Sequence, residues 1–182
     1  LGSSEYNPAY LNPTYNATGL TPSNYVIYSQ SYVGSVTDNN AKILAYVKNP
    51  YFNRSKFAYC SHRHTPFRLD EGTPAVVVGK EGGYIAFDIF NEYAQHGCYC
   101  AKEVVIRTID EILGKNKTLD TNLQSAGVVS LNDQKEKSRY VLHALYATPI
   151  KRGSGSGSVE VIEDLLPVCD TKFSIKIDKE VK

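Results

Sequence analysis

Residues 74–88 read Pro-Ala-Val-Val-Val-Gly-Lys-Glu-Gly-Gly-Tyr-Ile-Ala-Phe-Asp, and this stretch decides the fold of the first half of the chain. It begins with a short β-branched run and ends with a second apolar run, both typical of strands. The intervening residues 79–83 include three glycines, which tolerate positive φ and indicate a tight turn. The stretch therefore predicts a β-hairpin or a tight strand-turn-strand.

A helix is predicted to follow at about residues 89–114. Apolar residues recur there at three- and four-residue steps, as one face of a helix requires: Phe90, Ala94, Cys98, Ala101, Val105, Ile109 and Ile112. Asp88 is placed to cap the N-terminus, and Gly114 is a plausible stop. Gly97 inside the pattern predicts a kink or a break into two helices.

The residues before the hairpin contain two further β-type runs, at 25–28 and 41–47. Residues 1–23 are rich in Pro, Asn, Tyr and Ser, and we expect an extended segment that wraps a surface. Leu1-Gly2-Ser3-Ser4 resembles a cloning scar, which would lie outside the fold. The sequence contains no Met, so we expect that the chain starts after processing or is a piece of something longer.

The chain becomes all-β after the helix, with strands expected near residues 127–131, 139–146, 159–164 and 172–177. Strands at this spacing suggest a small sandwich. The run 153–158, Gly-Ser-Gly-Ser-Gly-Ser, predicts a flexible coil, either native or an engineered replacement of a loop. We expect two domains, 1–118 and 119–182. The predicted class is α+β or α/β, with a partial sheet and one long helix followed by a small all-β, sandwich-like domain.

The composition excludes several partners. Lys+Arg is 20 and Asp+Glu is 19, so no broad positive field favours nucleic acid or an anionic membrane. No apolar run approaches the length that spans a bilayer, and no signal-peptide pattern begins the chain. We therefore expect a cytoplasmic protein. The four cysteines indicate free buried thiols in a reducing compartment, and Cys98 and Cys100 would diverge by about 200° on a helix.

Polar and aromatic side chains concentrate in residues 51–73, which carry no clear period. Such a loop is where function usually lies. Its candidate binding or interface residues are Tyr51, Phe52, Asn53, Arg54, His62, Arg63 and His64. The two histidines could belong to a metal site only with further ligands, so we favour hydrogen bonding to neighbouring loops or to another subunit, and predict no metal and no cofactor.

No catalytic motif is complete. The sequence Gly97-Cys98-Tyr99-Cys100 lacks the second glycine and the preceding strand of an amidotransferase nucleophile elbow. Residues 79–83 lack the spacing of a phosphate-binding loop. An independent hydrolase that uses Asp70, Glu71 and the histidine pair stays open as a minor alternative. It predicts a closed polar pocket that joins residues 60–72 to Asp88.

Residues 50–66, which include Pro-Tyr-Phe-Asn-Arg and Cys-Ser-His-Arg-His-Thr-Pro, resemble a segment of multidomain bacterial glycoside hydrolases similar to the β-galactosidases that carry a trimerisation domain. Residues 75–90 and 93–113 resemble the last strand pair and closing helix of the family's glutamine-amidotransferase-like domain. Residues 140–143 and 159–164 resemble its C-terminal β-domain. One departure is Ser55-Lys56, where the family has a large aromatic residue.

The resemblance implies that the parent protein is a glycoside hydrolase whose catalytic carboxylates lie on an N-terminal (β/α)8 barrel. A barrel needs about 250 residues, so this chain does not contain one, and no catalytic residue can be assigned to it. The resemblance thus implies a non-catalytic assembly or accessory portion, with a second copy or the missing barrel as its partner. The alternative is a stand-alone carbohydrate-binding module that uses the aromatic loop 51–67.

Overall fold

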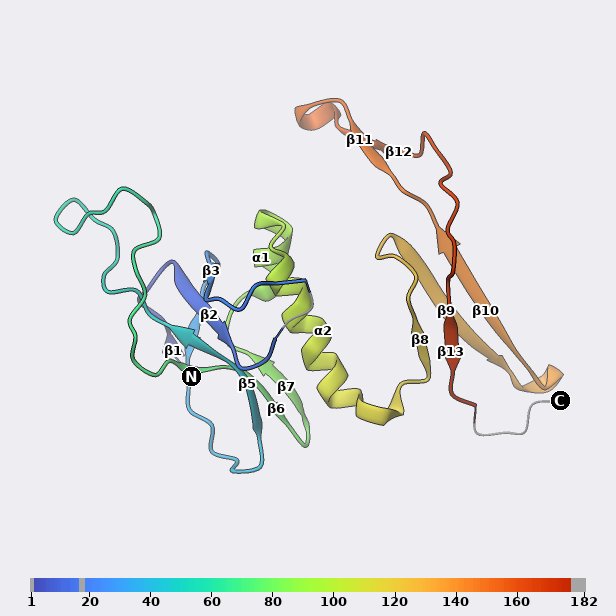
Figure 1. The fold of residues 1–182 in the computed structure, drawn as a ribbon, viewed down its shortest axis with the longest axis horizontal. Coiled ribbons are helices and arrows are strands. Elements are labelled where there is room, and N and C mark those ends of the chain that lie inside the picture. The colour runs from blue at the N-terminus through green and yellow to red at the C-terminus, as the bar shows by residue number, and fades with distance from the viewer. Residues whose placement is uncertain (1, 17–18, 178–182) are drawn as a thin grey trace. The chain divides into compact units, whose positions relative to one another are not determined.

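The computed structural model describes residues 2–16 and 19–177, and it divides into two compact units, Leu1–Gly114 and Lys115–Lys182 (Figure 1). None of the helices in the described part of the chain is long and apolar enough to cross a membrane.

The first unit is built on a five-stranded sheet with the order β3-β2-β5-β6-β7. Its strands are β3 (Tyr25–Ile27), β2 (Ala9–Pro13), β5 (Lys42–Lys48), β6 (Thr73–Gly79) and β7 (Gly82–Ile85). Every neighbouring pair is antiparallel. Of the two classes that the sequence predicts, the structure has α+β.

The stretch at residues 74–88 forms the predicted strand-turn-strand. β6 and β7 pair from Val76 with Ile85 to Gly79 with Gly82, and Gly82 has a φ of 148°, which only glycine adopts readily. Gly83 lies against the second helix, because a Cβ on it would stand 2.6 Å from Thr108 Cγ2. The turn and the close helix contact therefore both require glycine.

The predicted helix is broken in two. α1 (Ile89–His96) ends at Gly97, which has the left-handed φ of 60°, and α2 (Tyr99–Leu113) begins after the extended residue Cys98. This break shifts the buried face, so most of the expected apolar stripe is not buried. Phe90 and Ile109 are exposed, whereas the buried side chains are Ile89, Glu92, Cys100, Ala101, Val104 and Thr108.

The first 23 residues contribute to the sheet, which corrects the expectation of a surface-wrapping segment. β2 lies between β3 and β5, and Ala9, Tyr10 and Leu11 are buried. The presumed cloning scar is also part of the fold, since β1 (Gly2–Ser3) pairs with β4 (Tyr32–Val33). The buried run Pro8–Leu11 is short, and Ala9–Leu11 stands between the Asn-Pro pairs 7–8 and 12–13, which hides its strand character in the sequence.

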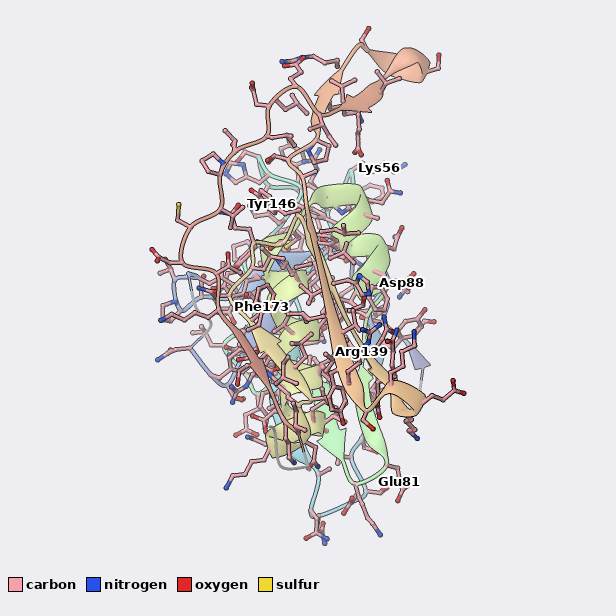
Figure 2. All side chains as sticks on the ribbon, turned by 90° about the vertical axis from the view of Figure 1, so that its right-hand side faces the viewer. Lys56, Glu81, Asp88, Arg139, Tyr146 and Phe173 are labelled. Atoms are coloured by element: carbon pink, nitrogen blue, oxygen red, sulfur yellow. The ribbon has the colours of Figure 1, made fainter. Side chains whose placement is uncertain are left out.

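The second unit consists of antiparallel two-stranded ladders. β9 (Gly127–Gln134) pairs with β10 (Arg139–Tyr146), β8 (Leu119–Thr121) with β13 (Phe173–Ile175), and β11 (Ile150–Arg152) with β12 (Val159–Val161). Figure 2 marks both ends of β10, at Arg139 and Tyr146, and places Phe173 on β13. The Gly-Ser run connects β11 to β12 and contains a short 3-10 turn, η3 (Gly155–Gly157).

The two units differ in burial. The first has a continuous core that includes Leu11, Ile27, Leu44, Val47, Val76, Phe87 and Val104. No residue described between 115 and 177 is buried. The class is thus α+β with one long helix and a β-rich, sandwich-like second unit, as predicted.

Candidate functional site

The loop between β5 and β6, which Figure 1 shows as a long excursion from the sheet, is closed at its base by backbone and side-chain hydrogen bonds. Tyr51 N–H donates to Pro66 O at 2.9 Å, and Thr65 Oγ1 donates to Phe52 O at 2.7 Å. The Tyr10 hydroxyl donates to Thr65 O, and burial raises the pKa of Tyr10. The base of the loop is therefore ordered by the sheet beneath it.

The tip of this loop presents aromatic and basic side chains. Phe57 is 89% exposed and Tyr59 is 69% exposed. The Lys56 ammonium lies 4.9 Å from the Phe57 ring centre, and the Arg54 guanidinium lies 5.1 Å from that of Tyr59. These cations occupy one face of each ring and stabilise the rings in an exposed position.

A second group of side chains surrounds Tyr28, the residue that follows β3. Arg63 stacks on the Tyr28 ring at 4.9 Å, and His64 Nδ1 lies 3.4 Å from the Tyr28 hydroxyl. His62 stacks on His64 at 5.6 Å with an interplanar angle of 15°. His96 of α1 contacts the Tyr28 ring at 5.2 Å. We call Tyr28, His62, Arg63, His64 and His96 the Tyr28 cluster.

The buried carboxylate of Glu92 anchors this cluster to α1. Glu92 is 1% exposed, and its Oε2 accepts the backbone N–H groups of Tyr28 at 2.9 Å and Ser29 at 2.6 Å. Its Oε1 lies 3.5 Å from His96 Nδ1. The carboxylate thus fixes the end of β3 against the helix and holds Tyr28 in place.

The N-terminal segment connects Asn53 to the same cluster. Asn53 Nδ2 donates to Glu5 O at 2.7 Å, and Asn53 Oδ1 accepts the Asn7 N–H at 3.1 Å. The Asn7 side chain in turn accepts from Arg63 at 3.4 Å and donates to Tyr28 O at 3.0 Å. A hydrogen-bonded path therefore runs from Asn53 to Arg63.

The seven predicted residues accordingly separate into three groups. The structure brings Asn53, His62, Arg63 and His64 together, directly or through Asn7 and Tyr28. Tyr51 and Phe52 lie at the base of the loop, and Arg54 belongs to the exposed tip. These placements leave their role in binding or assembly as a prediction.

Sequence reasoning missed Tyr28, Asn7 and Glu92, and it considered His96 only as a possible further metal ligand for the histidine pair. Glu92 and His96 are four residues apart, which places them on one helical face, and this spacing was a usable signal. Tyr28 stands at the end of a β-type run. Nothing in the nearby sequence indicates that Arg63, from a distant loop, packs on its ring.

The independent-hydrolase alternative predicts a closed polar pocket that joins residues 60–72 to Asp88. The described cavities do not join them. Glu71 lines a hollow with Asn12, Tyr46 and Lys48, whereas Asp88 lines a different one with Ser3 and Tyr84. Asp88 occupies the N-cap of α1, but its carboxylate makes no capping hydrogen bond, contrary to expectation. Among the described residues, no group of three or more His, Cys, Asp or Glu side chains could hold a metal ion.

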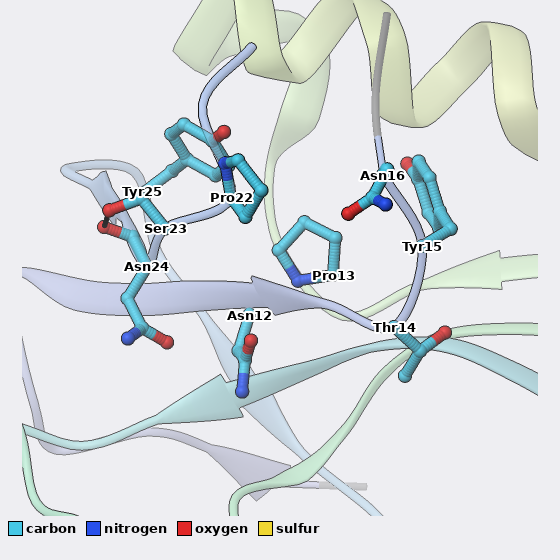
Figure 3. Close-up of a pocket in the computed structure, with 9 residues that line it drawn as sticks. All are labelled: Asn12, Pro13, Thr14, Tyr15, Asn16, Pro22, Ser23, Asn24 and Tyr25. Carbon is cyan, nitrogen blue, oxygen red and sulfur yellow. Dashed lines mark hydrogen bonds between the residues drawn. The ribbon is translucent and has the colours of Figure 1, made fainter.

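A separate pocket of about 320 Å³ lies where β2 ends (Figure 3). Tyr15 and Tyr25 stand on opposite sides of it, and Asn12, Asn16 and Asn24 contribute amide groups. Burial and the nearby Glu103 carboxylate raise the pKa of Tyr15 to about 12. Aromatic rings and amides are suited to a small polar ligand.

Comparison with known proteins identifies one informative relative. The chain is 35% identical to α-L-fucosidase isoenzyme 2 from Paenibacillus thiaminolyticus, with a TM-score of 0.88 over 97% of its own length. The chain is related to a glycoside hydrolase. It spans 26% of the fucosidase chain. No protein-family model and no curated protein matches the sequence.

The comparison confirms the expected relation to glycoside hydrolases at this coarse level. The relative is an α-L-fucosidase, and nothing in the comparison supports the finer resemblance to β-galactosidases. The identity of the two units as amidotransferase-like and C-terminal β-domains stays a prediction, as does the cytoplasmic location.

Proposed function

We propose that this chain is a non-catalytic assembly portion of a carbohydrate-acting glycoside hydrolase, and that the whole enzyme is an α-L-fucosidase. The observation that carries the proposal is the extent of the match, which takes in 97% of this chain but 26% of the fucosidase. Nearly all of the chain thus corresponds to a minor part of a larger enzyme.

The chemistry of the described loop supports a binding role and not a catalytic one. The Tyr28 cluster offers cationic, imidazole and hydroxyl groups, which bind and orient but lack the paired carboxylates of most glycosidases. Glu92, the buried carboxylate beside it among the described residues, accepts hydrogen bonds from two backbone N–H groups.

The exposed aromatic tip of the loop is the assembly surface in this proposal. Aromatic residues and arginine are enriched at protein interfaces, where a few of them supply most of the binding energy. Phe57 and Tyr59 are exposed on an ordered loop and stand next to Lys56 and Arg54. The partner is a second copy of the chain or the barrel domain of the same enzyme.

Light scattering coupled to size-exclusion chromatography tests this surface at two protein concentrations. We expect an oligomer that dissociates in the double variant F57S/Y59S. The matched variant is F90S, which removes an equally exposed aromatic ring from α1 (75% exposed). Dissociation in F90S alone would move the interface to the helices, and a monomer at both concentrations would overturn self-assembly.

A hydrolysis assay tests the non-catalytic part separately. The purified chain should release no 4-nitrophenol from 4-nitrophenyl α-L-fucoside above the buffer rate. Activity that coelutes with the chain and falls in a D70N/E71Q variant would instead support the independent hydrolase.

A carbohydrate-binding module is the second candidate, favoured by the exposed Tyr51, Phe57 and Tyr59. Phe67 of the same loop is less accessible to a sugar, because it is half-buried and its ring packs against that of Tyr10, with ring centres 5.2 Å apart and an interplanar angle of 59°. Calorimetric titration with L-fucose and with fucosylated oligosaccharides distinguishes the two candidates. Binding that is lost in Y59S while the chain stays monomeric would favour the module.

A further inference from the structure

Two cysteines that the function does not use lie together at the start of α2. Cys98 Sγ and Cys100 Sγ are 3.0 Å apart. The expectation that their side chains diverge is wrong, because Gly97 ends α1 and Cys98 is an extended N-cap residue, not a helical one. Closing the remaining gap to the bond length of a disulfide, about 2.05 Å, requires a movement of about 1 Å.

The environment makes the two sulfurs unequal. A hydrogen bond from the Cys100 thiol lowers the pKa of Cys98 to about 6, and backbone N–H groups at the start of α2 act in the same direction. The same pairing and burial raise the pKa of Cys100. Thiolates at helix N-termini and in paired-cysteine motifs are the usual nucleophiles of disulfide exchange.

The groups around the pair are consistent with one charged sulfur at neutral pH. Glu92 from α1 opposes ionisation of Cys98, and Tyr15 and Tyr25 from the sheet side interact with Cys100. Cys98 is half-buried and can be approached, whereas Cys100 is 6% exposed. The accessible sulfur is therefore also the ionised one.

We propose that Cys98 and Cys100 form a reactive dithiol site for low-molecular-weight disulfides, with Cys98 as the attacking and Cys100 as the resolving cysteine. The Cys98 thiolate attacks one sulfur of the disulfide RSSR, forms a mixed disulfide and expels one thiolate. Cys100 then loses its proton, attacks Cys98 Sγ and expels the second thiolate. The two thiols are oxidised by two electrons to one intrachain disulfide, and RSSR is reduced to two RSH.

This oxidation has a local structural consequence. It removes the negative charge of Cys98 near Glu92, whose carboxylate holds the backbone of Tyr28 and Ser29. It also ties the N-cap of α2 to the first turn of that helix. The charge on Cys98 therefore acts electrostatically on Glu92, whose carboxylate holds the backbone of Tyr28 by a hydrogen bond.

The test uses the full chain in a C60S/C169S background, so that Cys98 and Cys100 are the remaining cysteines. The probe is the aromatic disulfide 5,5′-dithiobis(2-nitrobenzoate), whose released thiolate is coloured. We expect two coloured equivalents per chain and a product that has lost two hydrogens and carries no adduct. Trypsin releases residues 81–102, which contain both cysteines, so mass spectrometry locates the bond.

Serine variants separate the two roles. With C100S we expect one equivalent and a stable mixed disulfide at Cys98, and with C98S a much slower reaction. The serine hydroxyl of C100S can still donate a hydrogen bond to Cys98 Sγ in place of the Cys100 thiol, so we expect the pKa of Cys98 to stay near the value of about 6. An ordinary thiol has a pKa of about 8.5, so from pH 8 to pH 5.5 the rate of C100S relative to N-acetylcysteine should then rise by about 60-fold. This ratio cancels differences in access to the sulfur.

Three results would overturn the proposal. They are an adduct that persists with both cysteines present, a relative rate for C100S that does not rise at low pH, and a C98S rate equal to that of C100S. A serine variant that loses its far-ultraviolet circular dichroism is unfolded, and its reaction rate then says nothing about the site. In that case the mass of peptide 81–102 from the C60S/C169S protein tests the proposal by itself. A peptide 81–102 that has not lost two hydrogens refutes the dithiol site.

Discussion

Glu92→Ala should destabilise the first unit more than any ordinary surface change. The carboxylate is 1% exposed and accepts two backbone N–H groups, at 2.9 and 2.6 Å. Its removal leaves the buried Ser29 N–H and the part-buried Tyr28 N–H without an acceptor, at a cost of about 1–3 kcal/mol for a fully buried donor. We expect the free energy of unfolding to fall by about 3 kcal/mol, which for a unit of this size lowers the midpoint of thermal unfolding by about 12 °C or more.

The assay is urea and thermal unfolding followed by the near-ultraviolet circular dichroism of tyrosine, since the chain has 14 Tyr and no Trp. Glu92→Gln keeps an acceptor and should lose about half as much stability. Glu81→Ala changes an exposed turn residue and should stay within about 0.5 kcal/mol of the parent. If Glu92→Ala matches Glu81→Ala, the carboxylate does not hold β3 to α1 and the anchoring argument is refuted.

Three further predictions concern packing, pH and the loop. Gly83→Ala places a Cβ 2.6 Å from Thr108 Cγ2 and should cost about 1–3 kcal/mol in urea unfolding, with recovery in G83A/T108S. Tyr15 has a pKa raised to about 12 from 10.0, so the folded state favours the protonated phenol and the free energy of unfolding should decrease as the pH rises through this range. Absorbance titration of Tyr15→Phe should show one phenol fewer ionising near pH 12 than the parent, and an unchanged number there would contradict the assignment. Thr65→Val removes the hydrogen bond to Phe52 O and should speed tryptic cleavage after Arg54 and Lys56, whereas unchanged cleavage would show that the loop base does not depend on this bond.

The sequence predicted best where local chemistry decides the structure. The strand-turn-strand at 74–88 follows from β-branched residues and glycines, and the break at Gly97 follows from the one residue in the helix that readily adopts a positive φ. Both features depend on neighbours within a few residues. They could therefore be predicted without knowledge of the rest of the fold.

The site could be predicted only in part, because its geometry depends on distant segments. The composition of residues 51–73 pointed to the loop that carries His62, Arg63 and His64. Asn7, Tyr28 and Glu92 reach this group from three other elements. The prediction that the side chains of Cys98 and Cys100 diverge was wrong for a related reason. One extended residue at the helix break changed the direction of Cys98, and helical spacing no longer applied.

The second unit gives the physical reason to expect a partner. Isolated two-stranded ladders are marginal in water, and stability normally comes from an apolar face covered by another layer. β9 and β10 form such a ladder, yet Val128 is 66% exposed and its cross-strand partner Leu145 is 70% exposed. No described residue of this unit is buried. Because burial of apolar surface is the dominant favourable contribution to folding, these side chains gain most from a surface outside their own ladder. The proposed assembly role within a larger enzyme would supply such a surface.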